Sequence, residues 1–418
     1  MMRETSVIEI DLSAVAHNMA VIRRIVGPDC AICPIVKADA YGLGAVRIAR
    51  WLLQRAGGAA ADMVAVYTPR QAAELFRSAV SGSVLVLMPV REMGRADDLY
   101  RALICGRLHL SVHDSAHLAD LVRLSERYAF SIPLHLEVDT GMSRGGCNIA
   151  EAPAVLRRIA ESRRVHLAGI YTHFSSAETD VARTNEQAAR FDRFIDANRS
   201  MIPPHCLVHA ANSAATLRSR GFHKSMVRIG AAWAGYGPEL ISDRSLLPEA
   251  FQLRPAVTWT STIVHLKTIE PGTPVGYGAT WTARRRSVIG LVPVGYADGY
   301  PNALGGAGRA MVLVSSDEPG GARRRFVPVV GAINMDQITV DLTDLGPSCL
   351  SRISVGTPVE LITPDRNAPN HLPTLAAAAG TSFYELICRL SPSIRRAYRC
   401  DAPAVDVFPE ATRAAAAG

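Results

Sequence analysis

The chain has 418 residues, of which 48% are apolar and 20% are charged, and its formal net charge is +7. That length supports a full hydrophobic core and favours two domains over one. No stretch of about 18 apolar residues is present, so we expect no membrane span. The opening MMRETSVIEI contains an acid and no continuous apolar run, which argues against a secretory signal.

The basic residues are scattered through the sequence except for two triplets, Arg284–Arg286 and Arg323–Arg325. Each triplet precedes a stretch in which apolar residues alternate, and no aromatic residues interleave with the arginines. We interpret both triplets as solvated hairpin turns, and we expect no nucleic-acid partner.

The eight cysteines lie mostly inside apolar stretches and follow no regular spacing. This usage is typical of a reduced cytoplasmic protein, and we expect that location. Cys30 and Cys33 form one C-x-x-C pair, which neither a second pair nor neighbouring histidines accompany. We therefore interpret them as buried apolar thiols and expect no metal site.

Short β-rich runs alternate with segments of helical periodicity in the first part of the chain. Segments such as AVRIARWLLQRAG carry apolar residues three and four positions apart, which indicates helices. Alternating strands and helices imply parallel strands, and eight repeats favour a closed (β/α)8 barrel of the TIM type over residues 12–240. The expected strands are Ile32–Lys37, Met63–Tyr67, Ser83–Met88, Leu108–His113, Leu134–Val138, His166–Tyr171, Leu207–Ala211 and Met226–Ile229.

The pattern changes after about Gly237, where period-2 apolar runs are separated by Gly, Pro and Asp turns. This pattern predicts a mostly antiparallel β domain over residues 241–410. One helical insertion, HLPTLAAAAG, lies near its end. The strand at residues 6–12 precedes the barrel pattern and is expected to join the β domain, and residues 411–418 are expected to form a frayed tail.

Several chemically active residues would lie at the carboxyl ends of the barrel strands, where catalytic groups of such barrels project. Each has an ordinary explanation alone, but together they would share one mouth. An amine there can form a Schiff base with an aldehyde, a hydroxyl and backbone amides can bind a phosphate, and a guanidinium can donate to a ring nitrogen. The set therefore suits an anionic aldehyde cofactor, and its members are Lys37, Arg144, His173, Asn212, Ser213, Arg228, Gly230 and Ala231.

Eight collinear motifs carry a resemblance to a known family. From Ile8 to about Tyr398 the chain resembles the bacterial alanine racemases, through VKADAYGLG, DTGMSRGG, YTHF, ANSAA, VRIGAAWAGYGP, VGYGATW, VGYADGYP and NMDQITVDL. The resemblance implies a pyridoxal 5'-phosphate enzyme that interconverts L- and D-alanine. It also implies a homodimer whose active sites are completed by residues from the partner chain.

The resemblance assigns the two bases to Lys37 and Tyr277. Lys37 would hold the cofactor as an aldimine and act as the base for D-alanine, while Tyr277 would enter from the partner subunit as the base for L-alanine. Arg228 would contact the pyridine nitrogen, with His173 between Arg228 and Tyr277. The other implied contacts are phosphate binding by Tyr41, Ser213, Gly230 and Ala231, substrate carboxylate binding by Arg144 and the Met335 backbone amide, and an entrance residue, Tyr296.

General acid–base chemistry agrees with these assignments. Racemisation removes a proton from one face of a carbon and returns one to the other, so two bases on opposite faces are needed. A free tyrosine has a pKa near 10, so a tyrosine base needs nearby positive charge or donors, which His173 and Arg228 can supply. Because a guanidinium keeps its proton, we expect the pyridine nitrogen to stay unprotonated and the ring to be a weaker electron sink.

Three positions depart from the family pattern. Glu137 stands where many members have a lysine that becomes carbamylated and supports the arginine next to the substrate. We expect its carboxylate to supply that negative charge and orient Arg144; the alternative is a neutral substitution whose role is lost. Asn334 replaces a cysteine of some relatives, and Pro392 replaces a tyrosine near the phosphate, which removes one hydroxyl donor.

The sequence leaves other functions open. One is another barrel-type pyridoxal-phosphate enzyme, either an amino acid decarboxylase or a racemase of broader specificity. Decarboxylases of this type place an acid near the pyridine nitrogen, whereas this chain has Arg228. A non-catalytic pyridoxal-phosphate-binding protein would not need the long β domain with Tyr277. We expect the D-alanine that the enzyme makes to be used for peptidoglycan, although a catabolic role is equally compatible with the residues.

Overall fold

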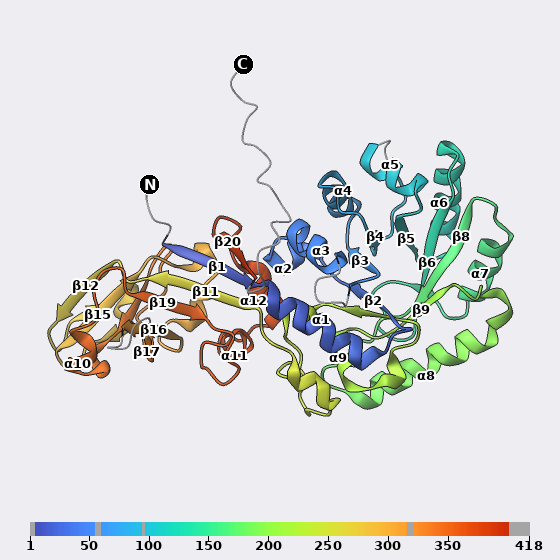
Figure 1. Cartoon of the computed structure of the whole chain (residues 1–418). Helices are drawn as coiled ribbons and strands as arrows, with labels where there is room; N and C mark the ends of the chain where they lie inside the picture. Colours follow the sequence, from blue (N-terminus) through green and yellow to red (C-terminus); the bar gives the residue numbers. More distant parts are fainter. Residues whose placement is uncertain (1–4, 55–59, 94–96, 316–321, 401–418) are drawn as a thin grey trace, which may run out of the picture.

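Eight parallel strands form the sheet of the first domain. The computed structural model describes residues 5–54, 60–93, 97–315 and 322–400. Each of the eight expected runs overlaps a strand, and Figure 1 shows them wound into a barrel with helices outside. Their bounds are β2 Ala31–Pro34, β3 Met63–Val66, β4 Ser83–Val86, β5 Leu108–Val112, β6 Ile132–Asp139, β8 Val165–Tyr171, β9 Leu207–His209 and β10 Met226–Ile229.

The strand order is β2-β10-β9-β8-β6-β5-β4-β3, with parallel pairing throughout. An isolated parallel bridge between Ile35 and Ala65 joins the two outer strands, and the Val36 amide donates to the Ala65 carbonyl at 2.8 Å. The sheet is thus nearly closed. The predicted TIM-like barrel is confirmed, and the carboxyl ends of its strands meet at one mouth.

Helices follow the strands, and short polar residues begin many of them. Asp11, Asp114 and Asp180 each accept a hydrogen bond from a backbone amide in the first turn of the following helix, and Thr68 forms a capping box with Gln71. The helices are α1 Leu12–Val26, α2 Lys37–Gly42, α3 Ala45–Leu53, α4 Pro69–Arg77, α5 Asp97–Ile104, α6 Ser115–Tyr128, α7 Ala152–Glu161, α8 Val181–Ala197 and α9 Ser213–Arg218.

A nine-stranded sheet forms the second domain in the order β12-β15-β18-β17-β16-β19-β11-β1-β20. The N-terminal strand β1 pairs antiparallel with β11 and parallel with β20, so the chain starts in this sheet before it enters the barrel (Figure 1). Its strands are β1 Ser6–Asp11, β11 Val257–Thr262, β12 His265–Ile269, β15 Ser287–Val292, β16 Arg309–Ser315, β17 Ala322–Val330, β18 Ile338–Asp341, β19 Pro358–Ile362 and β20 Arg395–Arg399.

The mostly antiparallel β domain is confirmed, with two local differences. Arg284–Arg286 lie between β14 (Trp281–Thr282) and β15, as expected of a turn, but Arg323–Arg325 lie within β17 and pair with β16. The expected insertion forms α11 Leu372–Ala378, and a second helix, α12 Phe383–Arg389, follows it without having been predicted. The tail at residues 411–418 lies outside the described residues.

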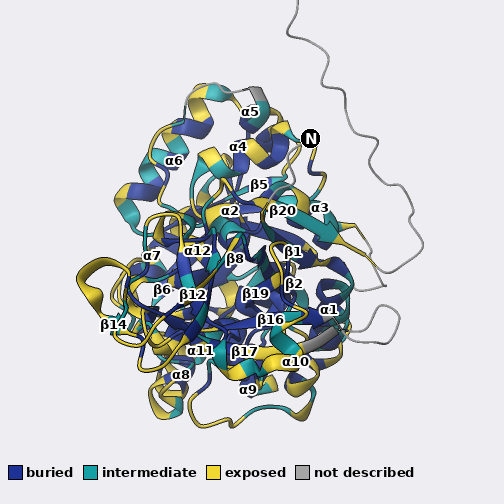
Figure 2. Ribbon diagram, turned by 90° about the vertical axis from the view of Figure 1, so that its left-hand side faces the viewer, coloured by how far each residue is buried: buried dark blue, intermediate teal, exposed yellow. Residues whose placement is uncertain are grey.

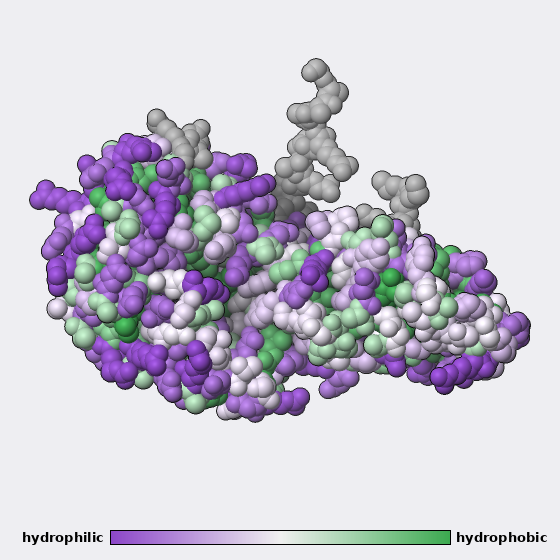
Figure 3. All heavy atoms as spheres, turned by 180° about the vertical axis from the view of Figure 1, so that it is seen from behind, coloured by the Kyte–Doolittle hydropathy of each residue, from purple (hydrophilic) through white to green (hydrophobic). Residues whose placement is uncertain are grey.

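Most strands of the two domains are buried and appear dark blue in Figure 2, whereas the edge strands β12 and β20 consist mainly of exposed and intermediate residues. On the face seen in Figure 3 the hydrophilic residues are spread over both lobes rather than gathered in one patch. None of the described helices is long and apolar enough to cross a membrane.

Candidate active site

A cavity of about 870 Å³ lies at the carboxyl ends of the barrel strands. The barrel supplies most of its wall, and α12 of the second domain supplies the rest through Tyr384 and Cys388. Most of the barrel residues singled out in the sequence line it together, namely Lys37, Tyr41, Glu137, Arg144, His173, Asn212, Ser213, Arg228 and Gly230.

Lys37 sits at the start of an unusual backbone turn. The next four residues, Ala38 to Tyr41, all have positive φ angles, between 52° and 59°, so they form one turn of left-handed helix. Such a conformation costs roughly 1–2 kcal/mol per residue for a non-glycine side chain. Asp39 closes the turn by accepting from the Ala45 amide at 2.7 Å. The turn therefore fixes the direction in which Lys37 and Tyr41 leave the barrel rim.

Strand β20 holds this turn from the second domain. Arg396 Nε donates to the Gly42 carbonyl at 2.9 Å, and Tyr398 Oη donates to the Leu43 carbonyl at 2.8 Å. The side chain of Tyr398 also explains Gly44, because a Cβ at that glycine would lie 1.9 Å from the tyrosine hydroxyl. The glycines after the lysine thus let the β domain approach the rim closely.

The amine of Lys37 makes no hydrogen bond or ion pair with any described residue. Burial lowers its pKa, and the positive charge of Arg144 lowers it further. Both effects raise the fraction of neutral amine, which is the nucleophilic form. Lys37 is therefore suited to attack an aldehyde.

Arg228 is 3% exposed and contacts two imidazoles and three carbonyls. Its Nη1 donates to His209 Nδ1 at 2.8 Å, and its Nη2 approaches His173 Nδ1 at 3.2 Å. The carbonyls of Thr172, His209 and Ala210 also accept from these nitrogens, so five acceptors share the four Nη protons. Burial lowers the pKa of Arg228, whereas these acceptors stabilise its charged form. Only Nε–H lacks a partner among the described residues.

Tyr41, Ser213 and Gly230 meet at the other end of the cavity. The Ser213 hydroxyl accepts from the Gly230 amide at 2.8 Å and from the Ala232 amide at 3.3 Å. Ala231 begins the short 3-10 helix Ala231–Ala234 directly after this glycine. A Cβ at Gly230 would lie 2.4 Å from Tyr41 Oη, so the missing side chain leaves the space that this hydroxyl fills.

Three of the sequence-predicted residues lie outside the cavity. Tyr277 is 78% exposed, Met335 is 55% exposed and Tyr296 is 44% exposed. They share one region of the β domain, because the Tyr296 amide donates to the Asn334 carbonyl and the loop before Tyr277 packs against residues 331–332. Figure 2 shows the β14 hairpin at the molecular surface, coloured as exposed. These side chains therefore do not contribute to the cavity of their own chain.

Comparisons with known proteins agree with this architecture. The alanine racemase N-terminal domain family matches residues 10–238, and the alanine racemase C-terminal domain family matches residues 256–398. An alanine racemase from Halothermothrix orenii is 32% identical over 393 residues, which cover 94% of this chain and 96% of the relative. The chain belongs to the alanine racemase family.

Two solved alanine racemases have the same fold over nearly the whole chain. The enzyme from Bacillus anthracis with bound L-Ala-P matches with a TM-score of 0.80 at 28% identity, covering 97% of each chain. The enzyme from Bartonella henselae with covalently bound pyridoxal phosphate matches with a TM-score of 0.76 at 26% identity, covering 95% of this chain and 100% of that one.

The cavity fits pyridoxal phosphate, on which alanine racemases depend. The free amine of Lys37 suits its aldehyde, and the remaining Nε–H of Arg228 suits its ring nitrogen. Tyr41 lines the cavity, and its Oη has no hydrogen-bond partner in the described parts of the chain, which suits an acceptor such as a phosphate oxygen.

Glu137 has other partners than the alanine racemase pattern led us to expect. Its Oε2 accepts from Tyr171 Oη at 3.0 Å and lies 3.2 Å from His113 Nδ1. Within the described residues no hydrogen bond or ion pair joins Glu137 to Arg144. Both line the cavity, but the expected orientation of Arg144 by direct contact with Glu137 has no support in the geometry.

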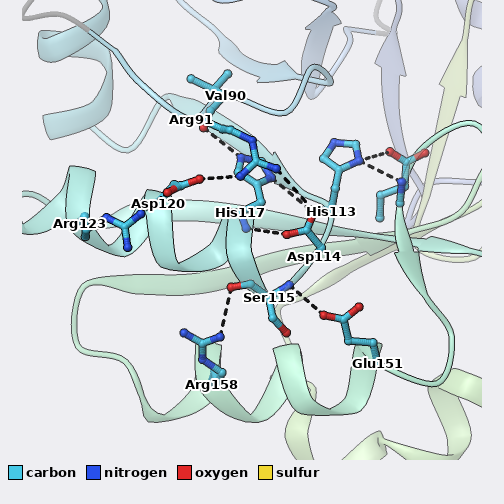
Figure 4. Close-up of polar contacts among 12 residues, drawn as sticks. Val90, Arg91, His113, Asp114, Ser115, His117, Asp120, Arg123, Glu151 and Arg158 are labelled. Atoms are coloured by element: carbon cyan, nitrogen blue, oxygen red, sulfur yellow. Dashed lines mark hydrogen bonds and ion pairs between the residues drawn. The ribbon is translucent and has the colours of Figure 1, made fainter.

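Behind Glu137, a polar cluster fixes the segment that follows β5 (Figure 4). Asp114 accepts from the His117 amide and so begins α6, and Arg91 pairs with Asp120 at 2.6 Å. His117 Nε2 lies 3.0 Å from the Val90 carbonyl. The cluster thereby holds His113, which accepts from the Gly146 amide at 3.0 Å and forms the wall beside Glu137.

Sequence reasoning missed several residues of this alanine racemase cavity, namely His113, Tyr171, Tyr384 and Cys388. The barrel strands carried a signal for the first of these, His113. Polar residues occur at 109 and 111 of β5 and at 113 directly after it, and β6 has them at 135, 137 and 139, so polar residues recur at every second position. Because both faces of a parallel strand are usually apolar, this alternation indicates a polar barrel interior.

Adding a side chain at position 230 tests the proposed phosphate site. We expect Gly230→Ala to weaken pyridoxal phosphate binding by about 10- to 100-fold, because the new Cβ displaces the Tyr41 hydroxyl. The matched variant Tyr41→Phe removes that hydroxyl and most of the clash, so Gly230→Ala should cost less binding in that background. Titration of the apoprotein by absorbance measures both effects, and equal losses in the two backgrounds would contradict the contact.

Proposed function

We propose that this protein interconverts L- and D-alanine with Lys37 of one subunit and Tyr277 of its partner as the two bases. The observation that carries the proposal is the separation of these residues. Lys37 has its amine in the cavity, whereas Tyr277 is exposed on the other domain. A second copy of the chain can bring that tyrosine to the mouth.

The residues at the cavity suit pyridoxal phosphate in one orientation. Lys37 would hold its aldehyde carbon, Tyr41, Ser213 and the amides of Gly230 and Ala231 would hold its phosphate, and Arg228 would donate to its ring nitrogen. When bound, the cofactor supplies the electron sink that lets the α-proton of alanine leave. Arg228 keeps its own proton because its acceptors favour the charged form.

His173 connects Arg228 to the second base. Its Nδ1 is the acceptor for Arg228 Nη2, so its own proton resides on Nε2. Burial and the charges of Arg228 and Arg144 hold the pKa of His173 well below its usual range, so the ring stays neutral. A neutral ring with a fixed Nε2–H can donate to the oxygen of the partner's Tyr277. That hydrogen bond would stabilise the phenolate form of the tyrosine, which is the form that accepts a proton.

The exposed residues support a shared site. Tyr277, Tyr296 and Met335 are large apolar side chains on one region of the β domain, which is typical of an interface. At such an interface Tyr296 would line the entrance, and the Met335 amide would face the substrate carboxylate. Arg144 would bind the same carboxylate from the barrel, where it makes no ion pair with any other described residue. A homodimer is therefore part of the proposal.

The cellular setting follows from the activity and the thiols. All eight cysteines are free in the structure, which supports a reducing compartment, and we place the protein in the cytoplasm. We propose that the D-alanine it makes is used for peptidoglycan. Burial raises the pKa of Cys30 to about 11 and that of Cys33 to about 12, so both thiols stay protonated at neutral pH.

Circular dichroism of the substrate tests the activity. We expect L-alanine mixed with the loaded protein to lose its optical signal while the total amount of amino acid stays constant. D-alanine should reach the same end point from the opposite sign. A loss of amino acid with release of carbon dioxide would instead indicate a decarboxylase, and an unchanged signal would indicate a binding protein.

A further inference from the structure

Three histidines continue inward from Arg228 through the interior of the barrel. His209 Nε2 lies 2.9 Å from His135 Nδ1, and His135 Nε2 lies 2.9 Å from His109 Nδ1. His135 and His209 are fully buried, and His109 is half-buried. Together with the 2.8 Å contact between Arg228 and His209, these distances describe an unbroken chain of hydrogen bonds, which we call the histidine string.

The Arg228 end of the string fixes the direction of every hydrogen bond in it. A guanidinium only donates, so His209 Nδ1 must accept from Arg228 and its proton must lie on Nε2. The same argument then applies in turn to His135 and to His109. A second proton on any ring would place two N–H groups face to face.

Gly169 makes the string possible. The backbone register sets this residue of β8 beside His135 of β6 on one side and beside Leu207 of β9 on the other. A Cβ at Gly169 would lie 2.2 Å from His135 Nδ1 and 2.6 Å from its Cε1. Because β8 has no side chain at this level, the ring of His135 can reach across to His209.

We propose that the histidine string is a set of neutral Nε2–H imidazoles with one polarity, and that His135 and His109 are positioning residues for the Arg228 guanidinium. Each ring turns its lone pair toward Arg228, so the acceptor ends of three dipoles face a buried cation. No carboxylate forms an ion pair with Arg228 in the described part of the chain. The string thus stabilises the positive charge of Arg228, the residue that would donate to the cofactor's ring nitrogen. This functional part of the inference rests on the proposed function.

Burial favours the same protonation state. It holds the pKa of His135 and His209 well below the usual range, with Arg228 adding to the effect, and it lowers the pKa of His109 to about 4. The rings therefore remain neutral at the pH where the enzyme works. A string that neither gains a proton nor reverses its direction cannot carry protons into the cavity, so its role is to position and not to relay.

Nitrogen NMR tests the polarity without reference to activity. We expect the holoenzyme labelled with 15N-histidine to give the neutral Nε2–H pattern for His109, His135 and His209 at about pH 7.5. Single histidine-to-glutamine variants assign the signals. An Nδ1–H pattern, or a charged ring, at any of the three would overturn the proposal. His166→Gln, which changes an exposed histidine near His109, should leave the three patterns unchanged.

Two substitutions of similar size at His135 separate positioning from packing. His135→Gln keeps one acceptor and one donor, so we expect the Nε2–H pattern of His209 to persist and kcat to stay within about threefold. His135→Leu fills the space without either group, so His209 should lose its defined tautomer and kcat should fall about tenfold or more with little change in KM. If both variants give the same His209 pattern and the same kcat, the positioning role of His135 is overturned.

A further variant covers the case in which leucine is not tolerated. Gly169→Ala keeps all three histidines but pushes the ring of His135 aside, and we expect the same loss of the His209 pattern. An unchanged pattern in Gly169→Ala would contradict the string. If the patterns hold in a protein that does not racemise alanine, the polarity stands and the proposed function fails. If the protein racemises alanine with a different pattern, the proposed function stands and the polarity fails.

Discussion

Two inactive variants should restore activity when their subunits are mixed. Lys37→Ala removes one base and Tyr277→Phe removes the other, and each change alone should lower kcat by about 10²- to 10⁴-fold. In a mixed dimer one of the two sites combines the intact Lys37 with the intact tyrosine of the other chain. Random pairing makes half of the dimers mixed, so we expect about one quarter of the wild-type activity.

The control puts both substitutions in one chain. A mixture of Lys37→Ala with the double variant Lys37→Ala/Tyr277→Phe contains no lysine in any cavity and should stay inactive. Differently tagged subunits purified in tandem prove that mixed dimers have formed. If such dimers have no activity, the tyrosine does not act across the interface, and the exposure of Tyr277 needs another explanation.

The free energy of unfolding should fall steeply as the pH drops below about 6.5. Burial lowers the folded-state pKa of eight histidines, whereas the unfolded chain titrates near 6.5. Above that pH both states are neutral and the stability is fully present. Below it the unfolded state binds protons that the folded state does not, so stability is lost until the folded pKa values are reached. The eight are His109, His117, His135, His166, His173, His209, His223 and His371.

Each such histidine contributes a slope of at most about 1.4 kcal/mol per pH unit. Urea unfolding at about pH 7.5, 6 and 5 measures the sum, and His135→Gln should make the slope shallower by one group. His265→Gln, at an exposed position on β12, is the matched control and should change the slope less than His135→Gln does. Equal stability at about pH 7.5 and 5 would show that the buried rings gain protons freely in the folded state.

The barrel could be predicted from the sequence because the patterns that indicate its strands and helices are local. Each strand is a short apolar run, each helix has its own periodicity, and the alternation of the two leaves few topologies. The same logic predicted that Lys37, His173, Ser213 and Arg228 would meet, since the ends of parallel strands share one mouth. Only chain order and strand direction are needed for that inference.

The remainder of the cavity depends on packing between distant segments. Tyr384 and Cys388 reach the wall only because α12 packs against the turn after Lys37, as the contact of Tyr384 with Tyr41 shows. No local pattern predicts that docking. The left-handed conformation of Ala38 to Tyr41 could likewise not be predicted from the sequence, because non-glycine residues rarely adopt it. Neighbouring contacts impose it.

Glu137 illustrates a second limit. Its carboxylate suggested a negative charge that would pair with Arg144. The direction in which the side chain of Glu137 points, however, depends on which neighbours offer hydrogen-bond donors. Tyr171, at the end of the adjacent strand β8, donates to Glu137, and His113, directly after β5, lies 3.2 Å from it. Neither residue was considered from the sequence, although the alternating polar positions 109 and 111 of β5 continue to His113.

The contribution of α12 to the cavity wall has a consequence for protein engineering. A fragment that ends after β10 would keep Lys37, Arg228 and the phosphate-binding residues, yet it would lose the helix that covers Tyr41 and the β20 side chains that hold residues 42 and 43. Water would then reach the lysine from one side. Miniaturising this enzyme to its barrel should therefore fail unless a designed cap replaces both elements.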